Sequence, residues 1–516
     1  MEENILIIAN GYVITCDPAH RGGNYSLLIR DGRIGEITEG AESLLASHPR
    51  ATVVDAKDKL IVPGFVNAHS HSESILFKPL TDGRPLAEWS RHPLVRELYM
   101  QLTRTENNED LRIVTQAAYL AHLKSGTTCV GEYTLPVGGL GLRTIGKAIE
   151  QTGINYRLVL QNKVQMDHAR LLQRERQRYT VGLGWEEDFT AAHLNHHVSS
   201  AAALQCPVMA HIAESSSDGD IVKRRYARNT IDFLCEHRVL GENTLLAHCN
   251  HASPEEIDCV RRHGATVILS PRSAAFKQTG YPVLRHLASH NGRLCIATDW
   301  GSTDMLAEMK FLLQLPLFFH HVCRFTPADL IRMGTINAAH ALQMAEDIGS
   351  LEPGKRADLV LFSLRDIRFP FLRSHPSTDD LARLLVTECT AKDITDVMID
   401  GSFHMANGRV TVLDEHGAAA AFRRVHEKWH VDRGARLLHH AENSSGRSSS
   451  VPGIRTFSDS FYDGDSGDAE EGFSILGRSS STEQPSGPPP LSSAVPVVEP
   501  ELPKDVKKVF GEDDEL

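Results

Sequence analysis

The chain reads Ile61-Val62-Pro63-Gly64-Phe65-Val66-Asn67-Ala68-His69-Ser70-His71, an apolar run that passes directly into a His-x-His pair. Such a run is typical of a buried strand, and residues two apart in a strand point to the same side. Both imidazoles can therefore reach one metal ion at the carboxyl end of the strand. We predict that His69 and His71 are metal ligands; two polar loop histidines are the alternative.

Around this stretch, from residue 60 to about residue 342, short apolar runs alternate with helix-length amphipathic segments. This alternation predicts βα units on a parallel sheet, and eight such units fit a TIM barrel. The predicted fold class is therefore α/β, with a (β/α)8 barrel over residues 60–347. The predicted strands are residues 60–67, 127–131, 155–160, 180–183, 207–210, 244–247, 266–269 and 294–297.

The two ends of the chain have a different pattern. Residues 1–59 hold short apolar runs separated by turn signals such as Asn10-Gly11, and β character returns over residues 348–415. We predict that both segments build one small composite β-sandwich. Residues 416–442 are predicted to form a helix, and the acidic, Ser/Pro-rich residues 443–516 a disordered tail.

The formal net charge is −12, of which the predicted tail carries −8 through 14 acidic and 6 basic residues. The remainder of the chain is close to neutral, which argues against a binder of nucleic acid or membrane surfaces, because both need basic patches. The nine cysteines form no Cys-x-x-Cys pair, and no apolar stretch resembles a signal peptide or a membrane span. We therefore predict a cytoplasmic protein with reduced thiols.

Polar residues follow three later predicted strands, at the point where each strand ends. They are His211, His248 and Asp299. Barrel enzymes gather their active groups at the carboxyl ends of the strands, whereas a stabilising residue can lie anywhere. Each residue alone is a weak signal, but four strands with the same feature predict an active site at this face.

Four motifs occur in a fixed order: Pro-Gly-x-x-Asn-x-His-x-His over residues 63–71, His211-Ile212-Ala213-Glu214, Ala247-His248-Cys249 and Thr298-Asp299. With this combination, residues 5–415 resemble the amidohydrolase superfamily. The similarity is greatest to the branch of guanine, cytosine and S-adenosylhomocysteine deaminases and triazine hydrolases. The resemblance implies a (β/α)8 barrel with a composite β-sandwich. It also implies one divalent metal ion as cofactor, Zn, with Fe or Mn as alternatives.

The resemblance also implies roles for individual residues. The implied metal ligands are His69, His71, His211 and Asp299. His248 and Asp299 would orient and deprotonate the attacking water, and Glu214 would be the acid/base that protonates a ring nitrogen of the substrate. Members with two metals commonly use a carbamylated lysine on the fourth strand. Residues 180–184 contain no lysine, so a single metal is favoured.

Two segments depart from the pattern of the related deaminases. After the seventh predicted strand the chain reads Ser270-Pro271-Arg272-Ser273-Ala274, where those deaminases carry flanking asparagines. Ser270 is a candidate substrate contact in this altered segment. Glu73, two residues after His71, is a second candidate that could bind an amino or cationic group, and a surface carboxylate is the alternative. Known substrates of the relatives are therefore not transferred.

The predicted function is a metal-dependent hydrolase that deaminates an aminated N-heterocycle of purine, pyrimidine or triazine type and releases ammonia. The alternatives are hydrolysis of an amide or chloride at the same site, and a non-catalytic scaffold homologue. The complete set of ligand residues argues against the scaffold. The predicted partners are a small-molecule substrate, a second copy of the chain in a homodimer, and an unidentified protein that binds the tail.

Overall fold

The computed structural model describes residues 5–90, 92–171, 178–282, 287, 293–318, 325–369 and 376–433. The predicted tail of residues 443–516 lies outside the described residues. The predicted helix of residues 416–442 is described as far as residue 433. Its first part is α18, Glu415–Glu427, which a short π-helical stretch, Lys428–Arg433, continues.

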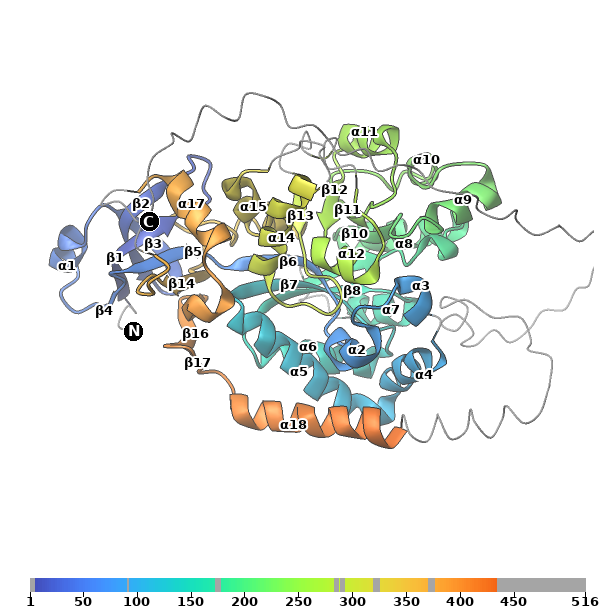
Figure 1. Ribbon diagram of the computed structural model, residues 1–516, viewed down its shortest axis with the longest axis horizontal. Coiled ribbons are helices and arrows are strands. Elements are labelled where there is room, and N and C mark those ends of the chain that lie inside the picture. Colours follow the sequence, from blue (N-terminus) through green and yellow to red (C-terminus); the bar gives the residue numbers. More distant parts are fainter. Residues whose placement is uncertain are drawn as a thin grey trace, which may run out of the picture. The chain divides into compact units, whose positions relative to one another are not determined.

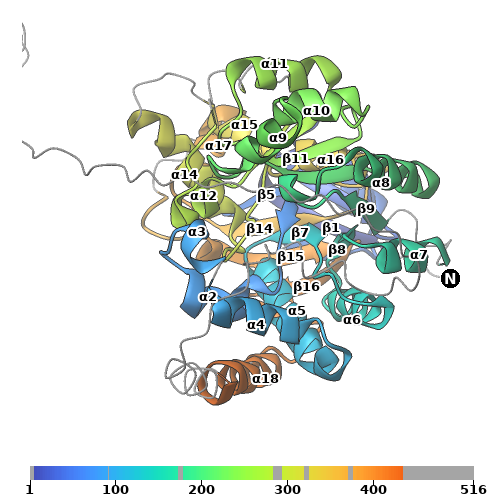
Figure 2. The same cartoon turned by 90° about the vertical axis from the view of Figure 1, so that its right-hand side faces the viewer.

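Eight parallel strands form the predicted barrel, and neighbouring strands pair in chain order (Figures 1 and 2). They are β6 Phe65–Ser70, β7 Thr127–Tyr133, β8 Asn155–Leu160, β9 Tyr179–Gly182, β10 Val208–Ile212, β11 Thr244–His248, β12 Thr266–Leu269 and β13 Leu294–Ile296. Nearly every residue in them is buried, because helices cover the outer face and side chains fill the interior. The (β/α)8 barrel is therefore confirmed.

The first predicted strand, residues 60–67, is in fact two strands divided at Gly64. Strand β5, Lys59–Pro63, belongs to the composite sheet, and the barrel begins with β6. A Cβ atom on Gly64 would lie 2.1 Å from Thr128 Oγ1, so only glycine allows the backbone to change sheets at this point. The apolar run is continuous because both strands are buried.

The composite β-domain predicted from both chain ends is confirmed as one mixed sheet of nine strands. Its strands are β1 Ile5–Ile14, β2 Gly22–Arg30, β3 Arg33–Thr38, β4 Thr52–Asp55, β5, β14 Leu359–Ser363, β15 Ile394–Ile399, β16 Ser402–Ala406 and β17 Arg409–Val410. The two chain ends meet where β5 pairs antiparallel with β14, with Val62 opposite Val360. Ile8, Leu27 and Leu361 belong to the buried core of this domain.

Helices lie between the barrel strands, and further helices lie before and after the barrel in the sequence. They are α1 Glu42–Ser47, α2 Ser74–Thr81, α3 Leu86–Trp89, α4 Pro93–Leu102, α5 Asn108–Lys124, α6 Gly139–Glu150, α7 Lys163–Leu171, α8 Ala191–Leu204, α9 Asp218–Tyr226, α10 Thr230–Glu236, α11 Pro254–His263, α12 Pro271–Lys277, α14 Met305–Phe318, α15 Pro327–Met333, α16 Ile336–Ala341 and α17 Thr378–Thr387. Within the described ranges, no helix is both long and apolar enough to cross a membrane.

The seam between the last and the first barrel strand is closed by residues of the predicted site. The Asp299 N–H donates to the His69 carbonyl at 3.0 Å, and the His71 N–H donates to the Asp299 carbonyl at 3.4 Å. The buried Asn67 amide reinforces the seam: it donates to Thr298 Oγ1 at 2.7 Å and accepts from the Thr298 N–H at 3.1 Å. Barrel closure and site assembly therefore use the same residues.

Candidate active site

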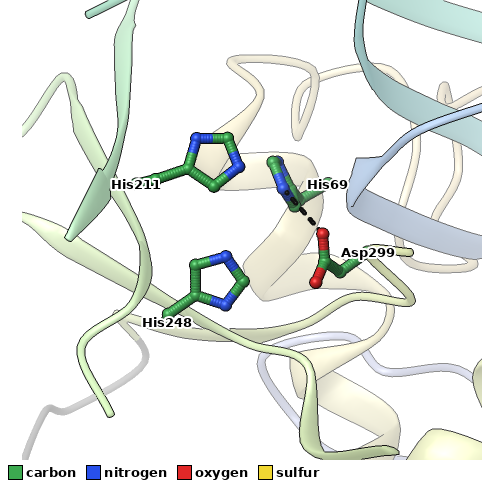
Figure 3. Close-up of side chains that lie close together, drawn as sticks. All are labelled: His69, His211, His248 and Asp299. Atoms are coloured by element: carbon green, nitrogen blue, oxygen red, sulfur yellow. Dashed lines mark ion pairs between the residues drawn. The ribbon is translucent and has the colours of Figure 1, made fainter. Parts of the chain in front are cut away.

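Four of the predicted site residues come together at the carboxyl ends of the barrel strands (Figure 3). His69 lies near the end of β6, His211 lies near the end of β10, and His248 is the last residue of β11. Asp299 follows β13. One ligand atom from each lies within 4.8 Å of the others, and all four residues are buried. In Figure 3 the three imidazoles and the carboxylate point toward one another. This is the clustering that the strand ends predicted.

His71 and Glu73 lie beside this cluster. His71 Nε2 is 3.4 Å from Asp299 Oδ1, and His71 Nδ1 is 3.5 Å from Glu73 Oε1. Burial alone would lower the pKa of His71, but the Asp299 and Glu73 carboxylates raise it to about 9. The cluster of four therefore contains His248, which was predicted to orient water. His71, which was predicted to be a metal ligand, lies next to the cluster. The division of these histidines into ligands and water-orienting groups stays a prediction.

Left-handed backbone conformations occur at two residues of the cluster and at one residue beside it. His248 has φ +76°, Asp299 has φ +53° and Ala213, between His211 and Glu214, has φ +46°. Non-glycine residues in the left-handed region cost free energy and persist only where the surroundings impose them. Here they turn the chain abruptly at the ends of strands β10, β11 and β13, so that the side chains face the barrel axis.

The residues fit a divalent cation. Four buried ligand atoms of the cluster have no hydrogen-bond partner among the described residues. They are His69 Nε2, His211 Nδ1, His248 Nε2 and Asp299 Oδ1. Leaving such atoms unpaired costs about 1–3 kcal/mol each, which a bound cation would recover. Burial lowers the pKa of His69 to about 4 and that of His211 well below its ordinary value, so both imidazoles are neutral, as metal ligands must be.

Lys277 links the acid/base residue to the cluster. Its Nζ donates to Glu214 Oε1 at 2.8 Å and to Asp299 Oδ2 at 2.6 Å, and Ser273 Oγ donates to Asp299 Oδ2 at 2.7 Å. Burial alone would raise the pKa of Glu214, but His248 and Lys277 hold it below its ordinary value. Sequence reasoning missed Lys277. A lysine one helical turn beyond Ser273, in the helix after a barrel strand, was the available signal.

Glu186 supports the segment that carries Glu214. It lies in a short 3-10 helix, Glu186–Asp188, and its Oε1 accepts the N–H of Ala213 at 3.2 Å. Burial raises the pKa of Glu186 to about 8, so its carboxyl group is mostly protonated at neutral pH. This second missed residue helps to hold the left-handed turn between His211 and Glu214.

A cavity of about 980 Å³ opens next to the cluster. Four aromatic side chains lie in its wall, together with His211, Glu214 and Lys277. The aromatic lining residues are Trp89, Tyr99, Trp185 and Trp300. Trp185 stacks on His211, with ring centroids 4.9 Å apart and 12° between the planes. Flat walls of this kind suit a planar ring.

Neither of the two predicted substrate contacts belongs to the residues that line this cavity. Ser270 is the residue before α12; it is buried, and its Oγ has no hydrogen-bond partner in the part of the chain that the structure covers. Glu73 is also buried and lies against His71, so the surface alternative considered for it does not hold. Contact of either residue with substrate stays a prediction.

Fold and site together define a (β/α)8-barrel protein with a buried three-histidine, one-aspartate cluster at the carboxyl ends of its strands. The chain belongs to the amidohydrolase family, which it matches over residues 60–403.

Curated relatives cover most of the chain. It is 27% identical over 400 residues to a 5-methylthioadenosine/S-adenosylhomocysteine deaminase of Syntrophomonas wolfei, a match that covers 73% of this chain and 88% of the relative. It is 25% identical over 437 residues to a 5'-deoxyadenosine deaminase of Methanothermobacter thermautotrophicus, covering 80% and 96%.

Solved structures share the fold. An adenosine deaminase from Xanthomonas campestris with bound zinc superposes with a TM-score of 0.72 at 21% identity, covering 82% of this chain and 98% of that one. The atrazine chlorohydrolase of Arthrobacter aurescens, in complex with zinc, gives a TM-score of 0.71 at 18% identity, covering 82% and 100%.

Proposed function

We propose that this protein is a metal-dependent deaminase of an aminated N-heterocycle, in which water replaces the amino group and ammonia leaves. The observation that carries the proposal is the position of Glu214. Its carboxylate lies 3.7 Å from His248 and 2.8 Å from Lys277 in the wall of an aromatic cavity, directly beside the metal-ligand cluster. Two curated relatives named for deamination of adenosine-like compounds support the same reaction class.

The metal-ligand cluster, Asp299 and His248 would together activate the attacking water. A divalent ion at the cluster supplies Lewis acidity that brings the pKa of water to near 7. Asp299, which Ser273 and Lys277 hold in place, accepts a proton from the attacking water, and His248 orients that water.

Glu214 is a carboxylate at rest, so it first takes one proton from the attacking water and then gives it to the ring nitrogen next to the carbon under attack. Asp299 passes the second proton of that water to the leaving amine as the carbon–nitrogen bond breaks, so one water is consumed and one ammonia is formed. Trp185 and Trp300 provide flat surfaces against which the ring can stack.

The metal that we propose is Zn²⁺, because three imidazoles and a carboxylate form a donor set typical of zinc. Fe²⁺ and Mn²⁺ are the alternatives that metal analysis would distinguish. The cytoplasmic location, the homodimer and a protein partner for the tail remain predictions from the sequence.

The test is metal content together with ammonia release across a panel of heterocycles. The panel contains 5'-deoxyadenosine, methylthioadenosine, S-adenosylhomocysteine, guanine, cytosine and an aminotriazine. We expect about one metal per chain and ammonia from at least one compound. Glu214→Gln should lower kcat by about 10²–10⁴-fold, while Glu255→Gln, an exposed glutamate in the first turn of α11, should leave it unchanged.

Three results would contradict the proposal or redirect it. Metal below about a tenth of an equivalent would refute a metal-dependent enzyme. Chloride release from a chlorotriazine without ammonia would favour the alternative hydrolysis. Equal activity of Glu214→Gln and Glu255→Gln would remove Glu214 from the mechanism.

A further inference from the structure

A second group of metal-binding side chains lies away from the site described above. It consists of Cys235 in the last turn of α10, and Cys259 and His263 on α11. One ligand atom from each lies within 4.8 Å of the others. Figures 1 and 2 show the two helices side by side. Cys259 and His263 are four residues apart, so they share one helical face, which is turned toward Cys235.

The distance between Cys235 and His263 matches that between two ligands of one ion. Cys235 Sγ lies 3.4 Å from His263 Nε2, and Cys259 Sγ lies 3.6 Å from the other ring nitrogen, Nδ1. Zinc bonds of about 2.3 Å to sulfur and about 2.0 Å to nitrogen, at a tetrahedral angle, place the two donors about 3.5 Å apart. Little movement is therefore needed for Cys235 and His263 to share a cation.

A backbone carbonyl orients the imidazole. His263 Nδ1 donates to the Cys259 carbonyl at 2.9 Å, which turns Nε2 toward Cys235. Ligand histidines in metal sites commonly have such a carbonyl partner on the second ring nitrogen. His263 also lies in the last turn of α11, where the partial negative charge of the helix end favours a cation.

The group is separate from the catalytic cluster. The helix α11 ends at His263 and leads within three residues into the start of β12, so His263 lies near the amino end of the strands. The catalytic residues occupy the carboxyl ends. Cys259 is buried, Cys235 is half-buried and His263 lies at the surface, so an ion from solution can reach the group.

We propose that Cys235, Cys259 and His263 form a second metal site, for a thiophilic divalent cation of the Zn²⁺ class with a water molecule as fourth ligand. Binding replaces the two thiol protons, which pass to the solvent. The bound ion would join the end of α10 to α11.

The test uses Co²⁺ as the probe on the full-length protein, stripped of metal and kept reduced with a phosphine. The catalytic cluster contains no thiol, so a near-ultraviolet sulfur-to-cobalt charge-transfer band reports the second site alone. We expect this band to saturate by two equivalents, one for each site, and to be lost or strongly weakened in Cys235→Ser and in His263→Gln. Cys206→Ser, at a buried cysteine outside this group, should keep the band. His69→Asn should keep it too and should saturate it at one equivalent, because this variant binds one cobalt fewer.

Circular dichroism and thermal unfolding of each variant show whether it is folded. Absence of the band in the folded wild-type protein would overturn the proposal, as would an undiminished band in folded Cys235→Ser. The chain has nine cysteines, and Cys235→Ser/Cys259→Ser therefore has seven. If the denatured wild-type protein purified without reductant shows seven free thiols, and the double variant also shows seven, the pair forms a disulfide and the proposal is overturned as well.

Discussion

Removal of the Lys277 ammonium tests whether the site is held together by charge. Its Nζ lies 2.8 Å from Glu214 Oε1 and 2.6 Å from Asp299 Oδ2, and all three side chains are less than a tenth exposed. At an effective dielectric constant of about 20, the Coulomb attraction of each contact is about 6 kcal/mol. The cost of removing the charged groups from water offsets most of this attraction. Removing the cation alone leaves two buried carboxylates uncompensated, and such losses cost about 3–5 kcal/mol.

We therefore expect Lys277→Met to lower the free energy of unfolding of the metal-free protein by about 3–5 kcal/mol at pH 7. The measurement is urea unfolding in the presence of a chelator, with unchanged m-value as the check that the same structure unfolds. The matched control is Lys124→Met, which removes an ion pair with Glu415 in which both partners are a third or more exposed. That pair should contribute only about 0–1 kcal/mol.

The dependence on pH separates charge from packing. Lys277 holds the pKa of Glu214 and of Asp299 below the ordinary values, so its contribution is present above those ordinary values and is lost on acidification. In Lys277→Met the carboxyl groups no longer gain from the lysine, so the deficit should shrink as the pH falls from about 5 to about 3, through their ordinary pKa values. A deficit as small as that of Lys124→Met, or one that is the same at both pH values, would refute the reasoning.

Three further changes have defined outcomes. Burial raises the pKa of Glu186 from 4.5 to about 8, so its contribution to stability is complete below about pH 4.5 and is lost as the pH rises toward 8. Glu186→Gln should therefore flatten the fall of the urea midpoint between pH 5 and pH 8, and an unchanged slope would contradict this. A Cβ atom on Gly131 would lie 2.4 Å from the Ala68 carbonyl oxygen, beside His69. Gly131→Ala should thus lower the free energy of unfolding by about 1–3 kcal/mol and weaken metal retention. If the variant has the thermal stability and metal content of the wild type, the steric clash is refuted. Trp300→Ala should lower kcat/KM for a heterocyclic substrate by about 5–150-fold, the equivalent of about 1–3 kcal/mol of stacking, and unchanged kinetics would place the ring elsewhere.

The barrel was predictable because its strands are buried on both faces and read as short apolar runs between amphipathic helices. The same property hid the division at Gly64, because strands of two different sheets follow one another without a polar interruption. Only the close approach of Thr128 marks the change of sheet, and that is a tertiary contact.

The clustering of His69, His211, His248 and Asp299 followed from strand ends meeting at one face of a barrel. The spacing of residues in the sequence could not predict whether His71 or His248 lies nearer the centre of the cluster, because both follow buried strands. Lys277 was missed for a similar reason. Its role depends on how α12 returns toward the barrel axis, and local pattern carries no information about that.

Pairing of β5 with β14 has a consequence for synthesis on the ribosome. Val62 and its partner Val360 are separated by 298 residues, so at about 5–20 residues per second the second strand emerges roughly 15–60 s after the first. During that interval the edge of β5 that β14 will cover has unpaired backbone groups, a template for pairing with another nascent chain. Chains halted before residue 359 would keep that edge open permanently. Nascent chains of this protein that are arrested before residue 359 should therefore require a chaperone to stay unaggregated.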